Sequence, residues 1–157
     1  MTSSGDMVKA AQAALHEPSK EPTRRLAVLA CQDARVDPWR ILKASPGEIH
    51  VLRNAGGIVT EDAIRSLFIS QRVLGTTKIM VLMHTDCGME GLDEAAVAAS
   101  AQQVLGTSPN FPLGSFNSVD VELPRGVAAL RDHPLLEGTV VGAIYDVKSD
   151  AVHTVPI

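Results

Sequence analysis

A chain of 157 residues with 45% hydrophobic and 20% charged residues is long enough to bury one core, so we expect one globular domain rather than a disordered chain. Its 18 Asp and Glu residues outnumber its 14 Lys and Arg residues, and the resulting charge of -4 argues against binding of nucleic acid through phosphate neutralisation. No apolar run reaches the ~20 residues that cross a bilayer, and the amino-terminal residues lack the basic start and apolar block of a secretory signal. We therefore expect a cytoplasmic protein with no membrane or nucleic-acid partner.

The first 24 residues differ in pattern from the rest of the chain. Apolar residues recur at helical spacing up to Leu15, before Pro18 and Pro22 interrupt the pattern, which predicts a short amphipathic helical arm over residues 1–24. A stripe this small does not support an isolated helix, so the arm is expected to pack on the body or on another subunit. Residues 25–157 are expected to form the single domain.

Strands and helices alternate along the rest of the chain. The apolar run 26–30 is typical of a strand buried on both faces, and the run 78–83 repeats this pattern. Pro124 leaves the start of the last helix open, because it either kinks that helix or marks its true start after an irregular lead-in at 119–123. In chain order, the expected elements are a strand at 26–30, a helix from 38 that ends before 46, a strand at 49–52, a helix at 61–74, a strand at 78–83, a helix at 95–105, a helix ending near 133, a strand at 139–147 and a short strand at 151–155.

This alternation predicts an α/β fold with a central, mainly parallel β-sheet of four to five strands flanked by helices. In open sheets of this kind the binding crevice lies beyond the carboxyl ends of the strands. Cys31 directly follows the first expected strand and His84 directly follows the third. Functional side chains are therefore expected at this edge of the sheet.

Cys31, His84 and Cys87 carry the chemistry of a metal site. Cys31 arrives from one strand, while His84 and Cys87 leave the turn after a neighbouring strand, so the three side chains are expected to converge. Zinc accepts Cys sulfur and His nitrogen in a tetrahedral shell, and three protein ligands with one open position are typical of catalytic zinc. The alternative is a pair of buried free thiols with no metal.

Asp33 and Arg35 add a charged pair beside these residues. Alternate positions past a strand end can face the same way, and Arg holds a carboxylate through two parallel hydrogen bonds. An ionised Asp33 could orient a zinc-bound hydroxide, could occupy the fourth zinc position, or could form with Arg35 a pair that serves stability alone. Thr85 and Asp86 are interpreted as capping residues with no catalytic role.

Three motifs in this order resemble those of the β-class carbonic anhydrases: Cys31-x-Asp33-x-Arg35, Arg53-Asn54-Ala55-Gly56-Gly57 and His84-x-x-Cys87-Gly88. The resemblance implies that one Zn2+ per subunit is held by Cys31, His84 and Cys87. It implies that Asp33 and Arg35 form a catalytic dyad, and that a zinc-bound hydroxide hydrates carbon dioxide to bicarbonate. It also implies a homodimer or homotetramer with the site near the subunit interface.

The substrate is the point on which alternatives stay open. The chain is short and is similar to the compact branch of this family that includes carbonyl sulfide and carbon disulfide hydrolases, which share the zinc site. A non-catalytic zinc-binding protein is an alternative of another class. Gly56, Gly57 and Ile58 follow the second strand and face the same crevice, so they either line the substrate pocket or form only a tight connection. Ala34 and Met83 stand where many members carry Ser and Gly, which affects the shape of the pocket.

Overall fold

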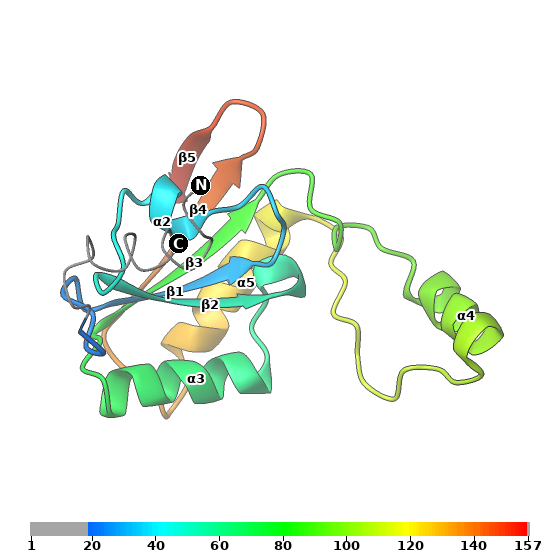
Figure 1. Cartoon of the computed structure of the whole chain (residues 1–157), viewed down its shortest axis with the longest axis horizontal. Helices are drawn as coiled ribbons and strands as arrows, with labels where there is room; N and C mark the ends of the chain where they lie inside the picture. The colour runs from blue at the N-terminus through cyan, green and yellow to red at the C-terminus, as the bar shows by residue number, and fades with distance from the viewer. Residues whose placement is uncertain (1–18, 157) are drawn as a thin grey trace, which may run out of the picture.

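The structure, a computed structural model, describes residues 19–156 and has a five-stranded sheet at its centre (Figure 1). The strands lie in the order β2-β1-β3-β4-β5, with β1 to β4 parallel and β5 antiparallel to β4. The α/β fold expected from the sequence is confirmed, whereas most of the arm expected at 1–24 lies outside the described residues. The strands are β1 (Leu26–Cys31), β2 (Ile49–Asn54), β3 (Lys78–His84), β4 (Thr139–Asp146) and β5 (Ala151–Val155).

The pairing register brings the carboxyl ends of the parallel strands to one edge of the sheet. Cys31 at the end of β1 pairs with Asn54 at the end of β2, and His84 at the end of β3 pairs with Tyr145 of β4. Every position of β1 after Leu26 is buried, because this strand has a neighbour on each side and protein over both faces. That double burial explains its unbroken apolar sequence.

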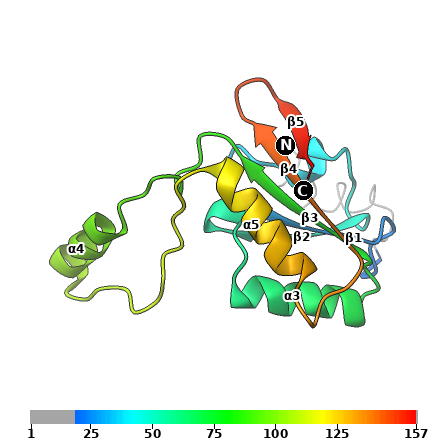
Figure 2. The same cartoon turned by 180° about the vertical axis from the view of Figure 1, so that it is seen from behind.

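Helices cover both faces of the sheet (Figures 1 and 2). The helices α3 (Glu61–Arg72) and α5 (Val119–Arg131) lie side by side on one face, over an apolar cluster that includes Cys31 and Cys87. The short helix α2 (Pro38–Ile41) and its flanking loops cover a second cluster on the other face. The two core clusters thus meet at the sheet, and the metal-ligand candidates belong to the larger one.

The structure shows where α5 begins, which the sequence left open at Pro124. The helix begins at Val119, with Ser118 as its N-cap, so Pro124 lies inside it rather than at its start. Proline has no N–H to donate to the carbonyl four residues earlier, which removes one helical hydrogen bond. Leu123 and Val127 are fully buried on either side of the proline, and this burial against the sheet holds the helix together.

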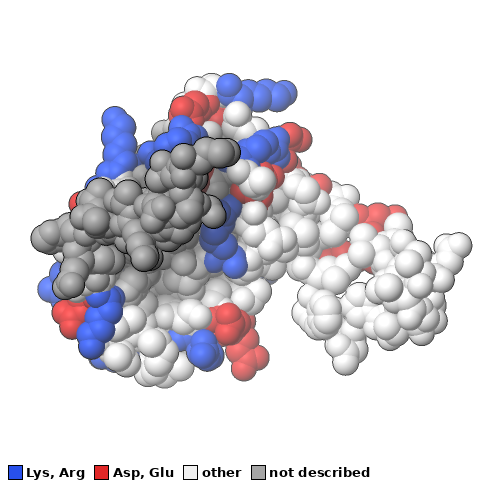
Figure 3. Space-filling model, viewed as in Figure 1, with Lys and Arg blue, Asp and Glu red and all other residues white. Residues whose placement is uncertain are grey.

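The helix α4 (Glu94–Leu105) projects from the body on two connecting segments (Figure 1). None of its residues is buried, and residues 95–119 contain no Asp, Glu, Lys or Arg, so the projecting part is white in Figure 3. Its root is held firmly, because the side-chain Oε1 of Glu94 accepts hydrogen bonds from the Ser115 N–H at 2.8 Å and the Ser115 hydroxyl at 2.6 Å. None of the helices in the described part of the chain has the length and apolar character that crossing a bilayer requires.

Candidate metal centre and active site

Cys31, His84 and Cys87 come together at the carboxyl edge of the sheet. Cys31 is the last residue of β1, His84 is the last residue of β3, and Cys87 lies in the turn that follows β3. Their ligand atoms all lie within 4.8 Å of one another, and the two Sγ atoms are 3.9 Å apart. All three residues are buried, and both cysteines are free thiols. The structure thus assembles the three residues that the sequence singled out as metal ligands.

The geometry of this cluster fits a tetrahedral ion. Two zinc–sulfur bonds of about 2.3 Å at the tetrahedral angle place their sulfurs about 3.8 Å apart, close to the observed separation of Cys31 and Cys87. His84 Nδ1 lies 2.9 Å from the carbonyl oxygen of Thr85, to which it donates its proton, and this bond leaves Nε2 as the ligand atom. Within residues 19–156, Nε2 of His84 is the one buried side-chain nitrogen or oxygen that lacks a hydrogen-bond partner. A metal ion would satisfy that atom.

The two thiols differ in acidity. Burial raises the pKa of Cys31, but His84 and the backbone N–H groups of Asp33 and Gly56 together outweigh burial and lower this pKa to about 7. Burial raises the pKa of Cys87 to about 11. Metal ions bind thiolates, so Cys31 would be available as a thiolate near neutral pH, whereas Cys87 would have to lose its proton on binding a metal.

Asp33 and Arg35 form a bidentate pair directly beside the ligands. Arg35 Nε donates to Asp33 Oδ1 at 3.0 Å, and Arg35 Nη2 donates to Asp33 Oδ2 at 2.8 Å. These hydrogen bonds hold the pKa of Asp33 far below its usual range, so the carboxylate stays ionised. Its Oδ2 atom lies 3.9 Å from Nε2 of His84, which places a fixed negative charge next to the ligand cluster.

Arg35 has a second carboxylate partner that the sequence interpretation missed. Its Nη1 donates to Asp86 Oδ2 at 2.9 Å, and its Nη2 donates to the backbone carbonyl of Asp86 at 2.9 Å. The interpretation of Asp86 as a capping residue rests on its immediate neighbours; 51 positions separate it from Arg35, so no local pattern connects the two. The signal that the sequence offers is an acidic residue between two metal-ligand candidates, His84 and Cys87.

The end of β2 and the loop after it hold the end of β1 and the segment that follows it. Arg53 Nε donates to the Cys31 carbonyl at 2.9 Å, and Arg53 Nη2 donates to the Asp33 and Val36 carbonyls, each at 2.8 Å. The backbone N–H of Gly56 donates to Cys31 Sγ at 3.3 Å. The Arg-Asn-Ala-Gly-Gly motif therefore holds Cys31, a metal-ligand candidate, and the segment that carries the Asp33 carboxylate.

The residues expected to line a substrate pocket lie in this loop. Gly57 packs against the backbone of β1, since a Cβ at this position would lie 2.9 Å from the Cys31 nitrogen. A Cβ on Gly56 would lie 3.1 to 3.3 Å from Phe116, Ile58 and Met89. An apolar wall made by Ile58, Met89 and Phe116 thus stands beside the glycine that contacts the Cys31 sulfur. Met89 and Phe116 come from the root of the projecting α4 segment, and the sequence analysis did not connect them with the site.

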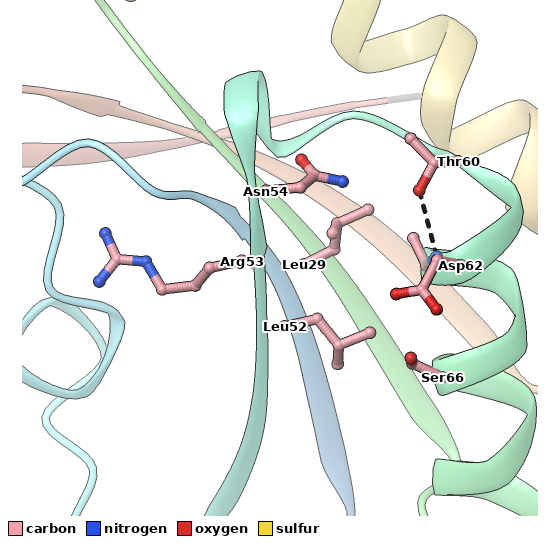
Figure 4. Close-up of a pocket in the computed structure, with 8 residues that line it drawn as sticks. Leu29, Leu52, Arg53, Asn54, Thr60, Asp62 and Ser66 are labelled. Carbon is pink, nitrogen blue, oxygen red and sulfur yellow. Dashed lines mark hydrogen bonds between the residues drawn. The ribbon is translucent and has the colours of Figure 1, made fainter. Parts of the chain in front are cut away.

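A cavity of about 290 Å³ lies between β2 and the amino-terminal half of α3 (Figure 4). In Figure 4, Leu52 and Asn54 point toward this helix, whereas the guanidinium of Arg53 points to the opposite side of β2. Leu29 also lines the cavity, and side chains two residues apart on a strand share a face, so the cavity lies on the sheet face that carries Cys31. Its lining residues are Leu29, Leu52, Arg53, Asn54, Thr60, Asp62, Ala63 and Ser66.

Comparison with known proteins agrees with this geometry. A sequence profile described as carbonic anhydrase matches residues 26–108, which contain all three metal-ligand candidates and the Asp33–Arg35 pair. Beta-carbonic anhydrase 1 of Mycobacterium tuberculosis is 36% identical over 136 residues, covering 85% of this chain and 83% of the relative. The chain belongs to the β-carbonic anhydrase family. Members of this family are enzymes, and among residues 19–156 the cluster of Cys31, His84 and Cys87 could hold a metal.

Relatives with a second activity are nearly as similar. A carbon disulfide hydrolase of an Acidianus strain is 35% identical over 152 residues, covering 80% of this chain and 74% of the relative. Among solved structures, a carbonic anhydrase from Streptococcus mutans has a TM-score of 0.86 at 35% identity, covering 99% of this chain and 100% of that chain. The apo form of a carbon disulfide hydrolase has a TM-score of 0.74 at 31% identity, and the match covers 95% of this chain and 87% of that chain. Family membership therefore leaves the substrate to be established.

Proposed function

We propose that this protein is a zinc-dependent enzyme that hydrates carbon dioxide to bicarbonate, with Zn2+ held by Cys31, His84 and Cys87. The observation that carries the proposal is the buried, unpartnered Nε2 of His84, which lies in a cluster with two cysteine sulfurs and 3.9 Å from an ionised Asp33. Zinc bound by such a set is a Lewis acid that makes hydroxide available near neutral pH. Three protein ligands leave room for that chemistry, because tetrahedral zinc takes a fourth.

The chain's own residues supply orientation and a water-poor wall. The Asp33 carboxylate is a hydrogen-bond acceptor held in a fixed position, because Arg35 donates a hydrogen bond to each of its two oxygens. With its pKa far below the usual range, Asp33 accepts a hydrogen bond from the attacking oxygen at any physiological pH and does not release a proton itself. Ile58, together with the Gly56 and Gly57 backbone, presents an apolar surface that suits a small linear molecule without charge.

Stopped-flow carbon dioxide hydration by zinc-loaded protein, beside a zinc-stripped control, tests this proposal. We expect turnover that depends on zinc. Arg35→Ala is expected to keep zinc but to lose about tenfold or more in kcat, because residues that orient groups at a metal site typically contribute ~10- to 100-fold. Arg72→Ala is the matched control, because Arg72 forms an exposed ion pair with Glu137 at 3.3 Å outside the site. A full complement of zinc without carbon dioxide turnover would contradict the proposal. It would leave hydrolysis of carbonyl sulfide or carbon disulfide as the next candidate, and a zinc-binding protein without catalysis after that.

Hydrolysis of carbon disulfide or carbonyl sulfide is the second candidate. The similarity to carbon disulfide hydrolases at 35% identity and the apolar side chains of Ile58, Met89 and Phe116 beside the ligands favour it. The measurement is release of hydrogen sulfide from each substrate by the same zinc-loaded preparation. A kcat/KM for carbon disulfide above that for carbon dioxide would make hydrolysis the main activity.

We also propose that the protein is a homodimer or homotetramer. The support is α4, a helix of 12 residues with no buried side chain, in which Val104 and Leu105 are 76% and 72% exposed. Isolated helices of fewer than about 12 to 15 residues are marginal in water, so contact with another subunit would stabilise this one. Sedimentation velocity at micromolar concentration tests the proposal, and a monomer would contradict it.

A further inference from the structure

The guanidinium of Arg35 lies between two carboxylates that come from different loops. On one side it forms two hydrogen bonds with the Asp33 carboxylate, and on the other it bonds both the carboxylate and the backbone carbonyl of Asp86. Asp33 follows the ligand Cys31, whereas Asp86 lies between the ligands His84 and Cys87. Arg35 therefore connects the two loops that supply the metal-ligand candidates.

The backbone of Asp86 is shaped for this contact. Its φ angle is +56°, a left-handed conformation that Asp and Asn adopt more readily than other residues with a side chain. In this conformation the carbonyl and the carboxylate of Asp86 both reach Arg35. The Asp86 side chain is 68% exposed, and its Oδ2 lies 2.9 Å from Arg35 Nη1.

We propose that Asp86 is a positioning residue that holds the Arg35 guanidinium in place and, through it, the Asp33 carboxylate. The inference rests on the proposed function, in which Asp33 orients the attacking oxygen. The Arg35 side chain is 47% exposed, so Asp33 alone would have to restrain a long side chain that water can reach. With Asp86 bonded on the far side, Arg35 is held at both ends. The catalytic group is then Asp33, and Asp86 acts on it through Arg35.

Two variants of Asp86 distinguish the role of its carboxylate from the role of its backbone conformation. Asp86→Gly removes the carboxylate and keeps the left-handed conformation without strain, whereas Asp86→Asn keeps the shape and a neutral acceptor. We expect Asp86→Gly to lower kcat for carbon dioxide hydration by about tenfold with KM changed less than about twofold. Asp86→Asn is expected to recover part of the loss, and zinc content is expected to stay at one per chain in both.

The structure offers a close control in Asp150. Asp150 also has a positive φ angle, +60°, and also pairs with an arginine: both of its carboxylate oxygens accept hydrogen bonds from Arg40, at 2.9 and 3.0 Å. It lies in the turn between β4 and β5 rather than beside the ligands. Asp150→Gly is therefore expected to affect stability and to leave kcat within about twofold of the parent protein.

A double variant decides whether Asp86 acts through Arg35. In the Arg35→Ala background, Asp86→Gly is expected to change kcat by less than about twofold, because the intermediary is already absent. A further large fall in that background, an unchanged kcat in the single Asp86→Gly variant, or a loss of zinc in that variant would overturn the proposal.

The Arg35 side chain gives a readout that does not depend on turnover. In 15N–1H spectra of the zinc-loaded protein, the Arg35 Nε–H signal is expected to be protected from solvent exchange, and Asp86→Gly is expected to weaken that protection. If the parent protein bound zinc but hydrated no carbon dioxide, the proposed function would fail, while this signal would still test the role of Asp86. An Arg35 signal equally protected in the parent and in Asp86→Gly would overturn the positioning role.

Discussion

Replacing Gly57 with alanine tests how closely the loop after β2 is packed against β1, the strand that ends at Cys31. Gly57 has a φ angle of +64°, and a Cβ at this position would lie 2.9 Å from the nitrogen of Cys31 and 3.0 Å from the carbonyl carbon of Ala30. Both are backbone atoms of β1, an interior strand of the sheet, so neither can move without disturbing the sheet. The left-handed conformation costs alanine roughly 1–2 kcal/mol. Overpacking of a core typically adds about 1–3 kcal/mol.

We therefore expect Gly57→Ala to lower the free energy of unfolding by about 2–5 kcal/mol. Gly75→Ala is the control, because Gly75 has a similar φ angle of +75° but no heavy atom within 4 Å of its Cβ position, so it carries only the conformational cost. Urea unfolding followed by circular dichroism gives both values, at one protein and one zinc concentration because metal binding and assembly contribute to stability. Equal losses in the two variants would refute the argument from close packing.

Three further outcomes follow from the charges at the site and in the β4–β5 turn. His84→Ala is expected to reduce zinc content from one per chain toward zero with the fold retained, and a full zinc content by atomic absorption would contradict the ligand assignment. Because the pKa of Cys31 is about 7 and that of Cys87 is about 11, zinc binding must displace protons, so competition with a chromophoric chelator should show affinity rising from pH 6 to pH 8. A flat profile would contradict those assignments. Arg40 holds the pKa of Asp150 below its ordinary value of 3.8, so this pair stabilises the fold above that pH and the contribution is lost as pH falls through the lowered value. The stability difference between the parent and Asp150→Asn should therefore be present at pH 6 and disappear in strong acid, and a difference that persists there would contradict the assignment.

The elements that sequence analysis predicted well are those whose signal is local. The apolar run of β1 is continuous because that strand is covered on both faces, and burial of this kind leaves a pattern within six residues. The convergence of Cys31 and His84 also followed from the sequence, because parallel strands bring residues at their carboxyl ends to one edge. The helix α3 ends at Arg72, two residues before its expected end, since helix ends are weakly encoded.

The local sequence pattern was insufficient for features that depend on contacts between segments far apart in the chain. A proline at position 124 is compatible with a start or a kink, and only the burial of Leu123 and Val127 against the sheet determines that the helix begins earlier. Asp86 has no local feature that distinguishes a cap from a partner of Arg35, because that contact exists only once β1 and β3 lie side by side. Side-chain hydrogen bonds between loops depend on how the strands are paired. A linear sequence therefore contains the donor and acceptor residues without showing which donor lies next to which acceptor.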